Sequence, residues 1–198
     1  MCVIIDPRKQ KATLCALVGV DMNVFIACSA SEKIENHYYD EMKNICNMLC
    51  DVGYDLLFSP YNKGMLSICY ETFKQRNKKI SGYTIEQYKS SLDVMPGVDC
   101  IIEDSSFDRL KAFYNDCDLF IFMPGGSGTI GELFGMIEEG KNNLQNKKIV
   151  LYNYNNFFKG LFDFINEKKA TNFIAENDLK SLIIINNFDE LKDLVNNK

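Results

Sequence analysis

The chain has 198 residues, of which 46% are hydrophobic and 25% are charged, as expected of one ordinary soluble globular domain with a real core. The net charge of −5 argues against a broad nucleic-acid-binding surface, which is usually basic. No apolar run approaches the ~20 residues that a membrane-spanning helix needs, so we expect no membrane segment.

Residues 1–22 are expected to form an N-terminal extension. Apolar segments at residues 3–5 and 12–20 flank a charged turn. They either pair as a strand hairpin at the edge of a sheet or leave the first segment as a loose arm. Apolar residues precede the charges, which is the wrong order for a secretory signal peptide, so a cytoplasmic protein is the default expectation.

From residue 23 onward, short apolar segments alternate with longer amphipathic ones. We predict strands at residues 24–28, 54–58, 79–83, 100–102, 119–123, 148–152 and 182–185. Helices are predicted at residues 38–52, 64–77, 107–115, 132–139, 158–168 and 189–195, with a helical piece at 174–178. The stretch 84–97 is the least regular and is either a lid or an ill-ordered loop.

This alternation predicts βαβ units and therefore a parallel sheet. The fold class is α/β: a single Rossmann-like domain over residues 23–198, with helices on both faces of the sheet, because the short strands are apolar on both sides. In such sheets ligands bind beyond the carboxyl ends of the strands. Three loops should converge there, at residues 29–32, 59–64 and 125–129.

Eight cysteines raise the question of disulfides or a metal centre. Six are scattered singly, and Cys46 and Cys50 are four apart on a predicted helix without a second pair. His37 is the only histidine, so a mixed Cys/His zinc site would need to be almost all thiolate. We therefore expect reduced, structural cysteines in a reducing compartment.

The most informative segment is PGGSGTIGE at residues 124–132, between a predicted strand and a predicted helix. A glycine turn that opens a helix directs backbone N–H groups and the positive end of the helix dipole at one place, which suits a phosphate. The candidate anion-binding residues are Gly125, Gly126, Ser127, Gly128 and Thr129. Glu132 adds a carboxylate about one turn away, although it also suits a helix N-terminus for its charge alone.

The same segment resembles the PGGxGTxxE signature of the LONELY GUY family, Rossmann-like proteins formerly described as lysine decarboxylases. Arg109 stands nine residues before Asp118, where the family carries an arginine. The segment Gly64-Met65-Leu66-Ser67 resembles the helix start of the family. The similarity covers nearly the whole chain from Val24 to Val195, and it is strongest over residues 118–132.

This resemblance implies hydrolysis of the N-glycosidic bond of a nucleoside 5′-monophosphate to free base and ribose 5-phosphate, with no metal or other cofactor. Glu132 would stabilise the oxocarbenium-like ribose and orient water, and Arg109 would contact substrate or pair with Glu132. The glycine segment would hold the 5′-phosphate. Further substrate contacts are expected from Ser29, Ser31, Gly64 and Met65, although the two serines also suit turns or caps. A homodimer is implied, with no nucleic-acid or membrane partner.

The chain departs from the family in three places. Leu110 follows Arg109 where a lysine is usual, and Gly131 replaces the first of two acids after the threonine. Residues 58–62 read Phe-Ser-Pro-Tyr-Asn where the family has a run of glycines. These departures keep a second hypothesis open, a nucleotide sensor of the same fold that binds without cleaving.

Two other functions find little support. A pyridoxal-dependent decarboxylase needs a Schiff-base lysine and a larger scaffold. An NAD-dependent redox enzyme carries its glycine motif after the first strand, with an acidic ribose-binding residue about 20 positions later. Here the motif follows the fifth strand of the predicted sheet.

Overall fold

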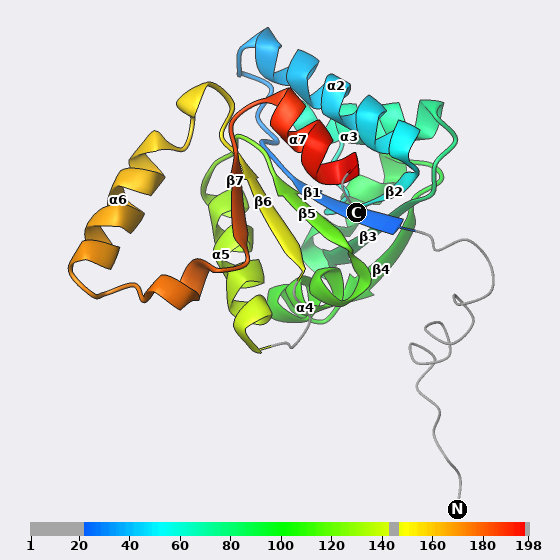
Figure 1. Ribbon diagram of the computed structural model, residues 1–198. Coiled ribbons are helices and arrows are strands. Elements are labelled where there is room, and N and C mark those ends of the chain that lie inside the picture. The colour runs from blue at the N-terminus through cyan, green and yellow to red at the C-terminus, as the bar shows by residue number, and fades with distance from the viewer. Residues whose placement is uncertain (1–21, 143–146, 197–198) are drawn as a thin grey trace, which may run out of the picture.

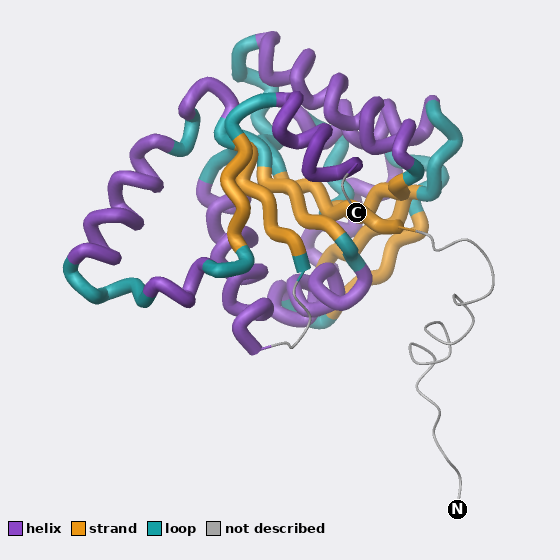
Figure 2. Tube along the Cα trace, in the orientation of Figure 1, coloured by secondary structure: helices purple, strands orange, loops and turns teal. Residues whose placement is uncertain are grey.

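The computed structural model describes residues 22–142 and 147–196, which form one parallel α/β sheet with helices packed on it (Figures 1 and 2). The strand order is β4-β3-β2-β1-β5-β6-β7, and every neighbouring pair is parallel. The strands are β1 (Met22–Ala27), β2 (Tyr54–Phe58), β3 (Ile80–Ile85), β4 (Asp99–Glu103), β5 (Leu119–Phe122), β6 (Lys148–Tyr152) and β7 (Leu182–Ile185).

Helices cover both faces of this sheet, as Figure 1 shows. One face carries α2 (Asn36–Val52), α3 (Gly64–Gln75) and α7 (Phe188–Asn196). The other carries α4 (Ser106–Asp116) and α5 (Ser127–Asn142), with α6 (Lys159–Ala170) packed partly against the same core at one side. Short 3-10 helices complete the described chain at η1 (Glu86–Val94), η2 (Tyr154–Asn156) and η3 (Glu176–Leu179).

The apolar character of both sides of each strand explains why two cores form. Side chains alternate along a strand, so Val24 and Ile26 pack under α2 and α3 while Phe25 packs under α4 and α5. The central strand β1 is paired on both edges, since Val24 aligns with Leu56 of β2 and with Leu119 of β5. Full burial of central strands is the arrangement expected of parallel sheets.

The predicted fold class is confirmed, and β2, β6 and β7 have the predicted bounds. Two predictions differ most from the structure. Helix α5 begins at Ser127 rather than residue 132, so residues 127–132 of the glycine segment are already helical. The stretch 84–97 is also more regular than expected, because Thr84 and Ile85 extend β3 and residues 86–94 form η1.

Six cysteines lie in the described part of the chain, and all six are free thiols, five of them buried. This agrees with the prediction of structural cysteines for those positions. Cys2, Cys15 and the predicted N-terminal hairpin at residues 3–20 lie outside the described residues. Among residues 22–142 and 147–196, none of the helices combines the length and apolarity that crossing a membrane requires.

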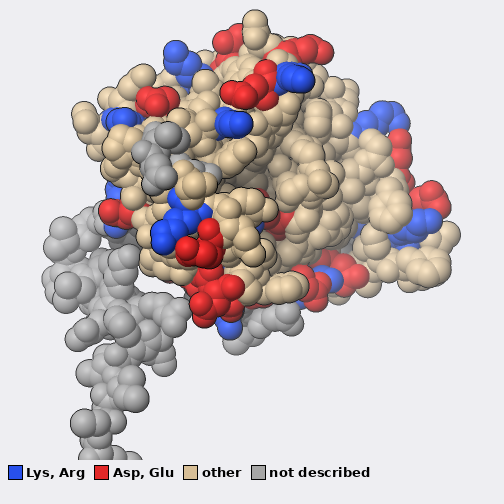
Figure 3. Space-filling view, turned by 180° about the vertical axis from the view of Figure 1, so that it is seen from behind, with Lys and Arg blue, Asp and Glu red and all other residues tan. Residues whose placement is uncertain are grey.

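Charged side chains of both signs lie around the rim of the face seen in Figure 3. Lysine and arginine side chains alternate there with aspartate and glutamate, and they surround a largely uncharged central area. This face shows no broad basic surface of the kind that binds nucleic acid.

Candidate active site

A cavity of about 530 Å³ lies at the carboxyl ends of the central strands, where the chain turns from one half of the sheet to the other. Its volume falls in the range of small-molecule sites. Residues from the ends of β1, β2, β3 and β5, and from α3, α4, α5 and η1, line it: Cys28, Ser29, Ala30, Ser59, Pro60, Tyr61, Leu66, Thr84, Tyr88, Arg109, Gly126, Ser127, Gly128, Thr129 and Glu132.

The glycine segment forms one wall of this cavity, at the start of α5. The backbone N–H of Ile130 donates to the carbonyl of Gly126 (3.1 Å), which is the first helical bond at this end. The N–H groups of Ser127, Gly128 and Thr129 belong to the first turn of α5, and the N–H groups of a first helical turn have no acceptor within the helix. The wall therefore combines free donors with the positive end of the helix dipole, which suits an anion.

The glycines of this wall differ in whether neighbouring protein atoms leave room for a side chain. A Cβ at Gly125 would lie 2.1 Å from Oγ1 of Thr129, so the threonine side chain can pack there only because residue 125 is glycine. A Cβ at Gly126 or Gly128 would meet no atom within 4 Å, and neither residue has a positive φ. Nothing in the described chain thus requires glycine at these two positions, and the space beside them opens on the cavity.

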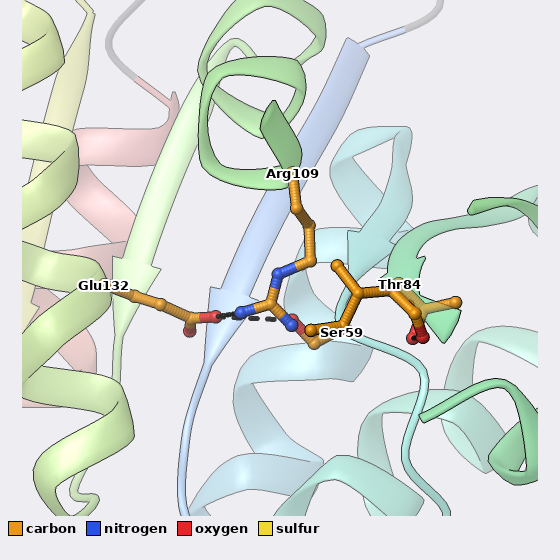
Figure 4. A network of polar contacts seen from close by, with 5 residues as sticks. Ser59, Thr84, Arg109 and Glu132 are labelled. Atoms are coloured by element: carbon orange, nitrogen blue, oxygen red, sulfur yellow. Dashed lines mark hydrogen bonds and ion pairs between the residues drawn. The ribbon is translucent and has the colours of Figure 1, made fainter. Parts of the chain in front are cut away.

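Glu132 and Arg109 form a mostly buried ion pair at the cavity. Nη2 of Arg109 lies 3.0 Å from Oε1 of Glu132, with side-chain exposures of 16% and 18%. The hydroxyl of Ser59 donates to the same Oε1 at 3.4 Å. Figure 4 shows how the three side chains, from α4, α5 and the end of β2, converge, with Thr84 beside Ser59.

Burial controls the ionisation of this carboxyl group. Loss of solvent around Glu132 raises its pKa above the usual value, and this effect outweighs the opposing effects of the Arg109 charge and the Ser59 hydrogen bond. The site therefore holds a carboxylate whose proton affinity is increased, next to a permanent cation. Such a pair can stabilise positive charge and accept a proton from water.

Arg109 also retains a donor for which the described chain supplies no acceptor. Its Nε is buried and has no hydrogen-bond partner among the described residues. The helix that carries it begins at Ser106, and the preceding residue Ser105 caps α4 because its Oγ accepts from the N–H of Asp108 (3.1 Å). A buried donor without a partner costs free energy, and a bound ligand can supply the missing acceptor.

The other residues predicted to contact substrate divide into two groups. Ser29 lines the cavity, but its Oγ accepts from the N–H of Ser31 (3.1 Å), which is a turn contact. Ser31, Gly64 and Met65 are not among the cavity-lining residues. Gly64 has a φ of +56° and packs against the backbone of residues 29–31, and Met65 is fully buried in the core. Their part in substrate binding stays a prediction.

Several lining residues had no role in the sequence-based prediction. Ser59, Pro60 and Tyr61 belong to a loop that was predicted to converge on the site, but none of the three was given a role of its own. Thr84 and Tyr88 lie in the stretch predicted to be a lid or an ill-ordered loop. Pro60 lies against β3, because a Cβ at Gly82 would be 2.4 Å from its Cγ. Glycine in one strand thus makes room for the bulkier loop of its neighbour.

Within the described residues, no group of three or more His, Cys, Asp or Glu side chains is placed to hold a metal ion. The polar atoms of the cavity are backbone N–H groups, hydroxyls and the Arg109–Glu132 pair. This donor set favours an anionic organic ligand.

Residues 66–195 match the sequence model of a family described as "Possible lysine decarboxylase". A cytokinin riboside 5'-monophosphate phosphoribohydrolase of Mycobacterium marinum is 27% identical over 90 residues, which are 46% of this chain and 48% of that protein. One of Arabidopsis thaliana is 20% identical over 173 residues, or 87% of this chain and 81% of that protein. The matched segment thus spans about half of the mycobacterial relative and most of the plant one.

Solved structures with the same fold include molybdenum cofactor proteins. The Moco carrier protein of Chlamydomonas reinhardtii superposes with a TM-score of 0.63 at 13% identity, covering 89% of this chain and 96% of that one. The molybdenum cofactor binding protein of Rippkaea orientalis gives 0.62 at 15% identity, covering the same shares. At these identities the likeness concerns the fold alone.

Proposed function

Since this chain belongs to the family described as possible lysine decarboxylase, we propose that it hydrolyses the N-glycosidic bond of a nucleoside 5′-monophosphate, giving free base and ribose 5-phosphate. The curated relatives are named as phosphoribohydrolases of a riboside 5'-monophosphate, which supports a nucleotide substrate. Among the described cavity-lining residues there is no lysine, so the cavity offers no amine for the Schiff base that a pyridoxal decarboxylase needs.

The observation that carries this proposal is the Arg109–Glu132 pair, which lines the same cavity as the start of α5. When the bond between C1′ and the base nitrogen breaks, its electron pair goes to the base and positive charge develops on the ribose. The Glu132 carboxylate stabilises that charge and takes a proton from the water whose oxygen bonds to C1′. The proton returns to the departing base, directly or through solvent.

Arg109 and the glycine wall have distinct parts in this proposal. Arg109 stays protonated, so it stabilises charge and fixes the carboxylate rather than delivering a proton. The N–H groups of residues 127–129, with Gly126 beside them, hold the 5′-phosphate. Binding energy from the phosphate, remote from C1′, then positions the reacting bond.

The test is base release. The protein is incubated with AMP, GMP, CMP and UMP, and free base is measured by chromatography. At least one nucleotide should lose its base, and Glu132→Gln should abolish release while leaving nucleotide binding largely intact. Glu138→Gln is the matched control, because this exposed residue lies on the same helix but does not line the cavity. Loss of release in both variants would contradict a specific role for Glu132.

One observation favours a second candidate, a nucleotide sensor. Ser59 replaces a glycine of the resembled family. Its hydroxyl donates a hydrogen bond to the same carboxylate oxygen of Glu132 that Arg109 contacts. If every nucleotide keeps its base but one binds tightly, the sensor function is correct. If none binds, the anion-binding assignment of residues 125–129 is wrong.

We also propose a cytoplasmic homodimer, as the resemblance and the free thiols imply. Support for self-association comes from one edge of the sheet. Ile101 of the edge strand β4 is 56% exposed, and Phe107 at the start of α4 is 85% exposed. Exposed apolar side chains of this size are typical of surfaces that bind another chain.

A further inference from the structure

The cavity has two chemically different ends. At the β5 end lie the free N–H groups of α5 and the hydroxyl of Thr129. At the other end, the loop after β2 contributes Pro60 and Tyr61, and η1 contributes Tyr88. Leu66 of α3 adds a further apolar side chain there. One end therefore suits an anion, and the other suits a flat apolar group.

The spacing of the two ends fits a nucleotide. The ends of β5, β1, β2 and β3 follow one another in the sheet, so the cavity extends over three strand spacings, about 14 Å. The hydrogen bond between Ser59 and Glu132 joins the β2 end to α5, which places the carboxylate between the two ends. A phosphate at the start of α5 and a ribose beside Glu132 leave the base at the aromatic end.

The two tyrosines have ring surface available for a ligand. Tyr61 is 36% exposed and Tyr88 is 53% exposed, and neither ring contacts another aromatic ring within the described part of the chain. The rings come from different elements that line the same cavity. Pro60, seated against Gly82, fixes the loop that carries Tyr61.

We propose that this aromatic end is the nucleobase subsite, and that Tyr61 and Tyr88 bind the base by stacking. The inference rests on the nucleotide ligand of the proposed function. Polar groups that read base edges are few at this end, since the hydroxyl of Thr84 is directed to the carbonyl of Ile85 (3.5 Å). Recognition then depends on ring area, so purine nucleotides bind more tightly than pyrimidine ones while AMP and GMP differ little.

The test compares ligands with and without a base. In a Glu132→Gln background, which prevents turnover, calorimetry gives the Kd of AMP, CMP and ribose 5-phosphate. Tyr88→Ala and Tyr61→Ala should each weaken AMP binding roughly 10-fold, a typical loss for one stacking ring. Ribose 5-phosphate binding should stay within about twofold, and Tyr88→Phe should bind AMP as the parent does. Phe173→Ala is the control, an exposed aromatic residue that does not line the cavity.

A second measurement does not depend on these losses. The chain contains no tryptophan, so Tyr88→Trp introduces a single fluorescent reporter at the subsite. Its emission should be quenched by AMP and GMP and unaffected by ribose 5-phosphate. Equal quenching by the base-free ligand would overturn the assignment.

The outcomes separate this inference from the proposed function. If the alanine variants weaken AMP and ribose 5-phosphate equally, or if AMP binds no more tightly than CMP, the subsite assignment is wrong even when base is released. If the unmodified protein releases no base but shows the predicted affinities, the subsite is correct and the hydrolase proposal is wrong.

Discussion

Leu110 of α4 lies in a gap of α5 that exists because residue 135 is glycine: a Cβ at Gly135 would be 2.7 Å from Cδ2 of Leu110. Arg109 precedes Leu110, and Glu132 lies one helical turn before Gly135, so the close approach of the helices brings the ion pair together. This packing gives a structural reason for a leucine where the resembled family usually has lysine.

Gly135→Ala should therefore separate α4 from α5. Overpacking of this kind costs typically 1–3 kcal/mol of the free energy of unfolding, and base release should fall because Arg109 and Glu132 move apart. Urea unfolding and the release assay measure the two effects. Gly131→Ala is the matched control, because its Cβ meets open space and alanine is about 1 kcal/mol better than glycine within a helix. Equal stability of the two variants would contradict the packing argument.

The glycine wall makes a second pair of predictions. Gly126→Ala and Gly128→Ala meet no protein atom, so the fold should tolerate them, but their methyl groups enter the space assigned to phosphate. KM should rise at least about tenfold, equivalent to ~1.4 kcal/mol of binding free energy. Gly125→Ala should instead lower the free energy of unfolding, because its Cβ collides with Thr129. Steady-state kinetics and urea titrations distinguish the two classes, and unchanged KM in both cavity variants would exclude a phosphate at this wall.

The pH dependence of base release should reflect the raised pKa of Glu132. The reaction needs the carboxylate, so kcat/KM should fall as the pH drops through that raised value, above the usual range of a glutamate. Ser59→Ala removes a hydrogen bond that favours the ionised form, so the acid limb should move to higher pH. Ser67→Ala, whose hydroxyl donates to the carbonyl of Gly64 outside the cavity, should leave the limb in place. If the acid limb of the kcat/KM profile does not move in Ser59→Ala, a group other than Glu132 is responsible for the loss of activity at low pH.

The same shift predicts how stability depends on pH. Because the folded-state pKa of Glu132 lies above its unfolded value, the folded protein favours the protonated carboxyl. That contribution is fully present below the unfolded pKa and is lost as the pH rises through the folded one. Glu132→Gln imitates the neutral form, so the variant should gain stability relative to the unmodified protein between acid and neutral pH. Denaturant unfolding at several pH values measures this difference, and a constant difference would refute it.

Phe107→Glu tests the proposed homodimer. A charge placed at this exposed apolar position should dissociate a dimer that uses the β4 and α4 edge, which light scattering measures directly. Phe173→Glu changes an equally exposed phenylalanine outside that edge and should leave the mass unchanged. A monomeric unmodified protein at all concentrations would end the homodimer proposal.

The alternation of apolar segments was enough to predict the sheet, because each strand is a short apolar segment with a clear boundary. Gly53 is one such boundary: it ends α2 with a φ of +102° and directly precedes β2. The pattern failed at the start of α5, where glycines have low helix propensity and the helix depends on its packing. It also failed at η1, which is a 3-10 helix and so does not follow the repeat of 3.6 residues that identifies an α-helix.

The site could be predicted only in part. The motif predicted anion binding at the glycine segment, and this stays a prediction. The resemblance implied that Arg109 contacts substrate or pairs with Glu132, and the pair is present. The contact of Ser59 with Glu132 was not predicted, because the two residues are 73 positions apart and share only an edge of the sheet. Tyr88 was missed for a different reason, since its element was not recognised at all.

The pairing of β1 has a consequence for synthesis of the chain. Ala27 of β1 aligns with Phe122 of β5. Phe122 leaves the ribosome about 95 residues after Ala27 does. At 5–20 residues per second, the edge of β1 that will meet β5 stays without its partner for roughly 5–20 s. The innermost strand of the finished sheet is thus an open edge in the nascent chain, and open edges recruit foreign strands. Protection by the ribosome or a chaperone would matter most in that interval.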